Sequence, residues 1–383
     1  MKTITNGKFI LPDEKGNFFI AENFSVTFDE KILKISFSEK DDEIIDAENC
    51  FVAPGFINIH IHGCDGCDVM DSNSESLEKI CKFLPSSGVT SFLPTTMTMK
   101  IPEIKSALEN IRNNQKSFQG SKILGVNLEG PFISKKFHGS HNPENIIPPD
   151  FEIFSDFADI IKIITFAPEE LEDFSFVDKC REKNIICSIG HSAADYETAK
   201  KFIEHGADHI THLFNAQTGL HHRKPGIVGA AFETNSTVEL IADNVHTSPT
   251  AQRIVWKMKP HDKIILITDS FRACGLGDGE SEIGGQKVFV KKNIATLDDG
   301  TIAASVAKMN EVVKKFFENT QASLTETVEL VTKNPAKRLN LYNEIGSIEV
   351  GKSADFVIFD ENFNIRKTII DGKIFNNIDD RNE

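Results

Sequence analysis

The chain has 383 residues, of which 42 are Lys or Arg and 57 are Asp or Glu, so its net charge is −15. This acidic balance argues against a nucleic-acid partner, because phosphate backbones bind to basic surfaces. Apolar residues make up 40% of the chain and 30 residues are Phe, which excludes disorder along its whole length. The N-terminus lacks the apolar core of a signal peptide, and no apolar run approaches the ~18 residues that a membrane helix needs. We therefore expect a cytoplasmic globular protein with no membrane partner.

The two ends of the chain share one pattern. Residues 1–52 alternate apolar and polar side chains around a polar turn at residues 13–16. Residues 343–383 do the same and contain a turn at Asp371-Gly372. Such alternation is typical of strands with one buried face. Because neither end is long enough for a large sheet, we predict that both ends together form one small β-sandwich domain.

Eight short apolar runs rich in Ile, Val and Phe lie between these ends. They begin at Ile57, Thr90, Ile123, Ile161, Ile185, His209, Val238 and Lys263. Stretches of helical character separate most of them, including residues 101–117, 196–205 and 249–258. Strands buried on both faces are continuous apolar runs of this kind. We therefore predict an α/β fold in which residues 53–342 form a (β/α)₈ barrel. An open doubly wound sheet is the alternative, and the count of eight favours closure.

Residues 271–300 interrupt this pattern with six glycines. We expect a long loop with a hairpin after the eighth strand. Long loops on the C-terminal side of a barrel are usually functional.

Polar, mostly titratable side chains gather where the expected strands end, which is where barrel enzymes place their active sites. The set consists of His60 and His62 (first strand), Glu129 (third), His191 (fifth), His212 and Asn215 (sixth), Asp243, Asn244 and His246 (seventh) and Asp269 (eighth). Five of the chain's 12 His fall in this set. This concentration indicates an active site.

Part of this set has the composition of a metal centre. Glu129, His191 and His212 provide one carboxylate and two imidazoles, which leaves a coordination position for water. His60 and His62 are two residues apart on a strand, so both rings face one side and could hold a metal. Each residue alone fits a buried polar group equally well, but the set favours metal binding.

Asp269 ends an otherwise apolar strand, where a carboxylate is costly without a partner. Beside a metal-bound water it could remove a proton and later return it to a leaving group. Orienting a metal ligand is the alternative role.

Two further groups are ambiguous. The basic cluster of residues 221–224, which includes Arg223, could bind an anion such as phosphate or could be a solvated loop. Cys64 and Cys67 are spaced as in redox or metal motifs, but no second such pair occurs, so we favour unreactive loop thiols.

Several motifs carry a resemblance to the amidohydrolase superfamily and, within it, to the family of N-acetylglucosamine-6-phosphate deacetylases. VAPGFINIHIHG (52–63) and GSIEVGKSADFVIFD (346–360) are similar to superfamily signatures. The narrower family is matched by NLEGPF (127–132), HGSHNP (138–143), GHS (190–192), THLFNA (211–216), RKPG (223–226), IADNVH (241–246), LITD (266–269) and ACGLGDG (273–279).

The resemblance implies metal-dependent hydrolysis of N-acetylglucosamine 6-phosphate to glucosamine 6-phosphate and acetate, in amino-sugar catabolism or recycling. It implies one or two divalent cations per subunit, Zn²⁺ or Fe²⁺ foremost and Mn²⁺ or Co²⁺ otherwise, and a homodimer. The implied roles are metal ligation by Glu129, His191 and His212, acid/base catalysis by Asp269, polarisation of the acetamide by His141, phosphate contacts from Arg223 and His246, and substrate contacts from Ser140, Asn215, Ala216, Ile302, Ala303 and Ala304.

The sequence departs from the family pattern at a few positions. His60 and His62 are present although some members lack them, so a second metal is possible. Arg272 follows Asp269 closely, where the family usually has small residues, and Ala304 stands where Gly is more usual, so the exact substrate could differ from that of the family. The alternatives are an N-acetylgalactosamine-6-phosphate deacetylase, another amidohydrolase, or a catalytically silent sugar-phosphate-binding protein. The complete set of ligands argues against the silent protein.

Overall fold

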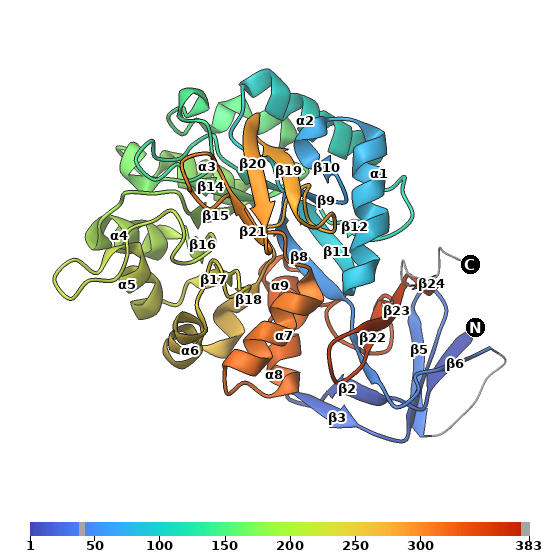
Figure 1. The fold of residues 1–383 in the computed structure, drawn as a ribbon. Coiled ribbons are helices and arrows are strands. Elements are labelled where there is room, and N and C mark those ends of the chain that lie inside the picture. Colours follow the sequence, from blue (N-terminus) through green and yellow to red (C-terminus); the bar gives the residue numbers. More distant parts are fainter. Residues whose placement is uncertain (38–42, 377–383) are drawn as a thin grey trace.

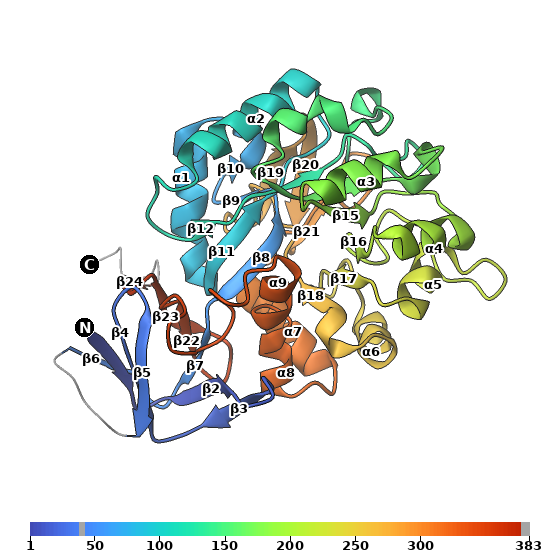
Figure 2. The same ribbon diagram turned by 180° about the vertical axis from the view of Figure 1, so that it is seen from behind.

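The computed structural model describes residues 1–37 and 43–376, and parallel strands surrounded by helices form its larger part (Figures 1 and 2). These strands are β8 (Phe56–Ile61), β11 (Val89–Pro94), β12 (Lys122–Ile123), β13 (Val126–Glu129), β14 (Ile161–Phe166), β15 (Ile186–Ile189), β16 (His209–Ile210), β17 (Thr237–Leu240) and β18 (Ile264–Leu266). Each of the eight expected strands is present. Most of their residues are buried, as parallel strands covered on both faces require.

The parallel strands form two sheets, with the orders β12-β11-β8 and β13-β14-β15-β16-β17-β18. A bridge between Thr95 and Asn127 joins them on one side. On the other side, the Asp269 N–H donates to the His60 carbonyl, and the His62 N–H donates to the Ser270 carbonyl. The segment after β18 therefore returns to β8, the first parallel strand.

The third expected strand was predicted as one run, but the structure divides it into β12 and β13. Gly125 lies at the break with φ of +144°, a backbone conformation that L side chains rarely adopt. A Cβ atom there would meet the Ile160 carbonyl oxygen at 2.6 Å. The chain therefore bends at this point instead of continuing the strand.

The helices are α1 (Ser74–Phe83), α2 (Ile101–Asn114), α3 (Ser175–Glu182), α4 (Tyr196–His205), α5 (Gly226–Glu233), α6 (Pro249–Met258), α7 (Met309–Asn319), α8 (Leu324–Glu329) and α9 (Lys333–Arg338). Short 3₁₀ turns occupy Val69–Asp71, Leu84–Ser87, Pro143–Asn145, Phe151–Ile153, Ser155–Phe157, Pro168–Glu170 and His261–Lys263. The predicted helices at 196–205 and 249–258 have these bounds. In α4, Asp195 caps the N-terminus by accepting from the Thr198 N–H, and Gly206 follows the last residue.

Strands from the two ends of the chain lie side by side, below the parallel strands in Figure 1. They are β1 (Lys2–Thr5), β2 (Lys8–Pro12), β3 (Phe18–Ala21), β4 (Phe24–Phe28), β5 (Ile32–Phe37), β6 (Ile44–Asp46), β7 (Phe51–Pro54), β22 (Phe356–Phe359), β23 (Ile365–Ile370) and β24 (Lys373–Asn376). They form sheets of order β5-β4-β1-β6 and β24-β23-β22-β7-β2-β3. Strand β7 pairs with both β2 and β22, and so connects the two ends.

These terminal strands enclose a separate apolar cluster, to which Val26, Phe28, Val52, Phe356 and Ile369 contribute. Strand β7 spans the predicted boundary between residues 52 and 53, and the division at 342 and 343 stays a prediction. Residues 38–42 and 377–383, which belong to the predicted terminal domain, lie outside the described residues.

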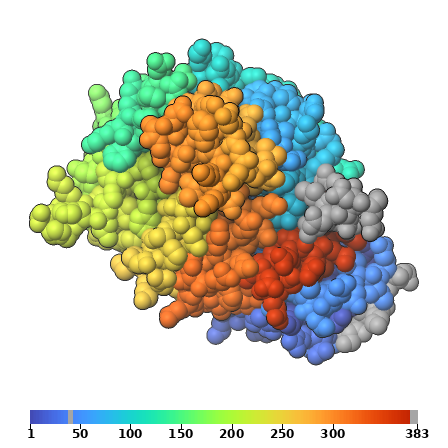
Figure 3. Space-filling model, viewed as in Figure 1, coloured from blue at the N-terminus to red at the C-terminus, as the bar shows by residue number. Residues whose placement is uncertain are grey.

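The glycine-rich segment forms a small antiparallel sheet instead of a single hairpin. Its strands are β19 (Gly279–Ile283), β20 (Gln286–Lys291) and β21 (Ile294–Thr296). A two-stranded hairpin of β9 (Gly63–Cys64) and β10 (Cys67–Asp68) follows β8. Figure 3 shows the three-stranded sheet, in orange, on the front surface of the molecule. In the described part of the chain, no helix has the length and apolar character to span a membrane.

Candidate metal and substrate site

The candidate site lies at the C-terminal ends of the parallel strands. Glu129 is the last residue of β13, and His60 lies near the end of β8. His191, His212 and Asp269 follow β15, β16 and β18, and all three have positive φ, at 47°, 26° and 50°. Non-glycine residues in this region of backbone space are uncommon and concentrate at functional sites.

The predicted ligands Glu129, His191 and His212 converge. Glu129 Oε1 lies 3.3 Å from His191 Nε2 and 3.0 Å from His212 Nε2, and the two ring nitrogens are 3.0 Å apart. Ligands about 2.05 Å from a tetrahedral cation are separated by roughly 3.3 Å. The three atoms are therefore spaced as ligands of one cation.

A second group adjoins the first. His62 Nε2 lies 3.2 Å from Asp269 Oδ1 and 3.1 Å from Glu129 Oε2, and His60 Nε2 lies 3.4 Å from Asp269 Oδ1. The three ligand atoms of His60, His62 and Asp269 lie within 4.8 Å of one another. Glu129 touches both groups.

The site attracts positive charge. Burial lowers the pKa of His62, but hydrogen bonds to Asp269 and Glu129 outweigh this and raise it to about 10. Burial likewise raises the pKa of Glu129, yet His60 and the other surrounding histidines hold it well below its usual value. Asp269 has a lowered pKa because His60 and His62 outweigh its burial. Both carboxylates are therefore ionised at neutral pH.

The ring nitrogens of His62 and His191 that face away from the site have the partners expected at a metal centre. Nδ1 of His62 lies 3.2 Å from the Thr95 carbonyl, and Nδ1 of His191 lies 3.0 Å from the Phe137 carbonyl. A carbonyl can only accept, so each Nδ1 carries a hydrogen and Nε2 is the ring nitrogen that faces the site, where a bound cation would take the place of any Nε2 proton. This donor set of carboxylate and imidazole suits Zn²⁺, Fe²⁺ and related cations.

His141 is held in the opposite tautomer. The Thr98 backbone N–H donates to its Nδ1 over 3.1 Å, so the ring hydrogen resides on Nε2. Nε2 faces the site, 3.5 Å from Glu129 Oε2. His141 is therefore placed as a hydrogen-bond donor to a bound substrate.

A cavity of about 310 Å³ opens over these residues. Among the predicted substrate residues, its lining includes Ser140, Asn215, Ala216, His246, Ile302 and Ala304, together with His62, Glu129, His141, His191, His212 and Asp269. His246 is oriented by Asp243, whose Oδ2 lies 2.7 Å from its Nδ1. Although burial lowers the pKa of His246, Asp243 raises it above the usual value, which suits an anionic ligand.

Other predicted residues lie elsewhere. Arg223 is exposed on the loop before α5, its guanidinium next to His222, and does not line the cavity of its own chain. Ala303 is buried in an apolar cluster with Phe271, next to the cavity rather than in its wall. Cys64 and Cys67 are buried, and burial raises the pKa of both thiols, which opposes reactivity.

Arg272 forms an ion pair with Asp71 over 2.8 Å. It therefore contacts the turn after β10, and it does not line the cavity.

The sequence interpretation missed several site residues. Gln286 Nε2 on β20 donates to the Ser140 carbonyl, and Thr301 and Ile283 line the cavity. Glu239 on β17 is fully buried and contacts His60. A carboxylate inside an apolar strand was the available signal for Glu239. No local pattern marked Gln286.

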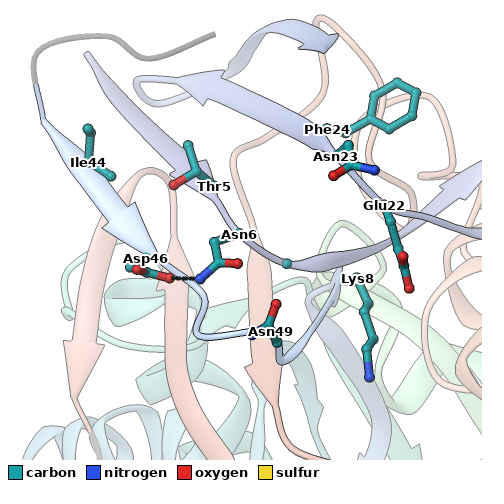
Figure 4. Close-up of a pocket in the computed structure, with 10 residues that line it drawn as sticks. Thr5, Asn6, Lys8, Glu22, Asn23, Phe24, Ile44, Asp46 and Asn49 are labelled. Atoms are coloured by element: carbon teal, nitrogen blue, oxygen red, sulfur yellow. Dashed lines mark hydrogen bonds between the residues drawn. The ribbon is translucent and has the colours of Figure 1, made fainter. Parts of the chain in front are cut away.

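A larger hollow of about 660 Å³ lies between the terminal strands (Figure 4). Its polar lining includes Asn6, whose Nδ2 donates to Asp46 Oδ1 over 2.8 Å. None of the described lining residues is His or Cys. The cavity at the strand ends is therefore the one that carries the chemistry argued above.

The chain is similar to known proteins over most of its length. Residues 51–375 match the model of the Amidohydrolase family. The chain is 42% identical over 330 residues to N-acetylglucosamine-6-phosphate deacetylase of Bacillus subtilis (strain 168), covering 84% of this chain and 83% of that protein. It is 30% identical over 349 residues to N-acetylgalactosamine-6-phosphate deacetylase of Escherichia coli O157:H7, covering 89% and 90%. The crystal structure of N-acetylglucosamine-6-phosphate deacetylase from Pasteurella multocida superposes with a TM-score of 0.92 at 29% identity, covering 98% and 100%.

Proposed function

The chain belongs to the amidohydrolase family, and we propose that it hydrolyses N-acetylglucosamine 6-phosphate to glucosamine 6-phosphate and acetate. The observation that carries this proposal is the convergence of Glu129, His191 and His212 beside Asp269 in one cavity. The 42% identity to the Bacillus subtilis deacetylase supports the choice of substrate.

We propose that Glu129, His191 and His212 hold one divalent cation, Zn²⁺ or Fe²⁺ foremost, and that His60, His62 and Asp269 provide a second position. A cation there would polarise the acetamide carbonyl and acidify the attacking water. Asp269 accepts the proton of that water and returns it to the departing amine, since an unprotonated amide nitrogen leaves poorly. His141 donates from Nε2 to the oxygen that becomes negative in the transition state.

Substrate recognition follows from the cavity lining. We propose that Ser140, Asn215, Ala216, Ile302 and Ala304 contact the sugar, with Ala303 shaping the wall from behind. His246 contacts the 6-phosphate, and the remote binding energy of that group positions the amide. Arg223 is exposed and does not line the cavity of its own chain, so we propose that it contacts the phosphate bound by a second copy in a homodimer.

The proposal also covers the closure of the barrel, the terminal domain and the location of the protein. We propose that the two parallel sheets act as one closed (β/α)₈ barrel, and that the terminal sheets form a β-sandwich. The return of the segment after β18 to β8 supports closure. We also propose a cytoplasmic location, because a doubly ionised sugar phosphate does not cross a bilayer unaided.

Acetate release from N-acetylglucosamine 6-phosphate tests the proposal, with the metal content of the same sample determined. We expect turnover that a chelator abolishes and that Zn²⁺ or Fe²⁺ restores. Unphosphorylated N-acetylglucosamine serves as the control and should be a much poorer substrate. Absence of acetate from a metal-loaded sample would contradict the proposed function.

A second substrate is favoured by one observation, the 30% identity to the Escherichia coli N-acetylgalactosamine-6-phosphate deacetylase. The two sugars differ only at C4, so the ratio of kcat/KM for the two substrates decides between them. Binding of either sugar phosphate without acetate release would instead indicate a silent binding protein.

A further inference from the structure

Glu239 is a fully buried carboxylate that the proposed reaction does not use. Its Oε2 lies 2.9 Å from His60 Nδ1 and accepts from the His212 backbone N–H over 3.1 Å. Its Oε1 lies 3.2 Å from His209 Nε2. Three N–H groups from β8, β16 and the segment after β16 therefore converge on one carboxylate. A buried charge persists only when it is satisfied in this way.

The contacts of Glu239 determine which ring nitrogen of His60 faces the candidate cation site. An ionised carboxylate can only accept, so Nδ1 of His60 carries a hydrogen and Nε2 is the ring nitrogen that faces the site. Nε2 has no hydrogen-bond partner among the described residues. It lies 3.4 Å from both Glu129 Oε1 and Asp269 Oδ1. Glu239 therefore contacts the ring nitrogen of His60 that faces away from the candidate cation site.

The same carboxylate touches both halves of the site. Oε2 binds the ring of His60 and the backbone of His212, whose φ of 26° is unusual for a non-glycine residue. His209 supports Glu239 in turn, and its Nδ1 contacts Thr237 Oγ1. This chain of contacts is buried throughout, so its geometry is protected from water.

We propose that Glu239 is the positioning residue of the His60–His62–Asp269 group, which sets the affinity of that group for a cation and links it to His212 of the neighbouring group. This inference rests on the proposed metal-dependent function, but it concerns how many cations the chain binds and how tightly. Partners of this kind typically change metal affinity by about 10- to 100-fold when they are removed.

The test uses the full-length Glu239→Gln variant. An amide accepts on one side only, so at least one of the three N–H groups loses its acceptor. Chelator-stripped protein is titrated with Co²⁺ alone, with calorimetry and the visible absorption of bound Co²⁺ as readouts. The His60→Asn variant identifies which binding step belongs to the His60 group. We expect E239Q to weaken that step by about 10- to 100-fold and the other step by less than about threefold.

Glu233→Gln is the matched control, because Glu233 is an exposed carboxylate that contacts Tyr196 and Lys200 on the outer surface. Equal affinities in E239Q and E233Q would overturn the inference, as would a wild-type titration in which no step changes in H60N. Should E239Q fail to fold, His209→Gln removes the ring behind Glu239 and is expected to weaken the same step in the same direction. An unchanged step in H209Q would then overturn it.

These readouts do not involve the sugar. A wild-type protein that binds two cations but releases no acetate would contradict the proposed function and leave the role of Glu239 intact. Acetate release by the wild-type protein, together with normal cation binding by E239Q, would support the proposed function and overturn the role of Glu239.

Discussion

Asp269 is the single side chain on which the proposed proton transfers depend. We expect Asp269→Asn to lower kcat by about 10²- to 10⁴-fold, because the amide can neither accept the proton of water nor donate it to the amine at this position. The cation held by Glu129, His191 and His212 should be retained, since none of those ligands changes. Steady-state kinetics together with metal analysis check both statements. A variant with near-normal kcat would remove Asp269 from the acid/base role.

Single residues differ in how far the sequence predicts them. Asp269, Glu129 and the histidines could be found because each stands at the end of an apolar run, where a barrel exposes its site. Glu239 stands within such a run and does not line the cavity, so strand ends alone did not mark it. Arg223 was predicted as a phosphate contact from its basic cluster and stays a prediction, because its exposure and its absence from the cavity lining depend on a loop conformation that the sequence does not show.

At the scale of elements, the sheet of β19–β21 supports the cavity wall. Gln286 on β20 donates to the Ser140 carbonyl, in the loop that also carries His141. We expect Gln286→Ala to raise KM by about fivefold, because a net hydrogen bond of ~1 kcal/mol that orders the loop is lost. Metal content should not change.

Lys287→Ala is the control for this effect, because Lys287 is on the same strand and its exposed side chain pairs with Glu280. Steady-state kinetics of both variants on the same substrate give the comparison. An equal rise of KM in both variants would attribute the effect to the strand and not to the contact with Ser140.

The same elements show what a sequence pattern can predict. The eight strands and the helices α4 and α6 follow from apolar runs and helical periodicity, which are local properties. The bend at Gly125 was missed because it depends on the nearby Ile160 carbonyl, which is distant in sequence. The third strand of the β19–β21 sheet was missed because its segment, residues 294–296, is too short to show alternation.

At the scale of the whole molecule, the first and last segments of the chain hold each other in place. Phe356 on β22 is fully buried, and its ring lies 5.1 Å from that of Phe28 on β4. We expect Phe356→Ala to lower the free energy of unfolding by about 3–5 kcal/mol, because the substitution leaves a cavity between the two ends of the chain. Below the unfolding transition, kcat and KM should be unchanged, since Phe356 does not line the active-site cavity.

Phe19→Ala is the control for this prediction. Phe19 lies on β3 and is 43% exposed, so its replacement should change the free energy of unfolding by only about 0.5 kcal/mol. Denaturant unfolding and steady-state kinetics of the two variants check this separation. A loss of activity in folded F356A would instead mean that the packing of the terminal strands affects the geometry of the active site.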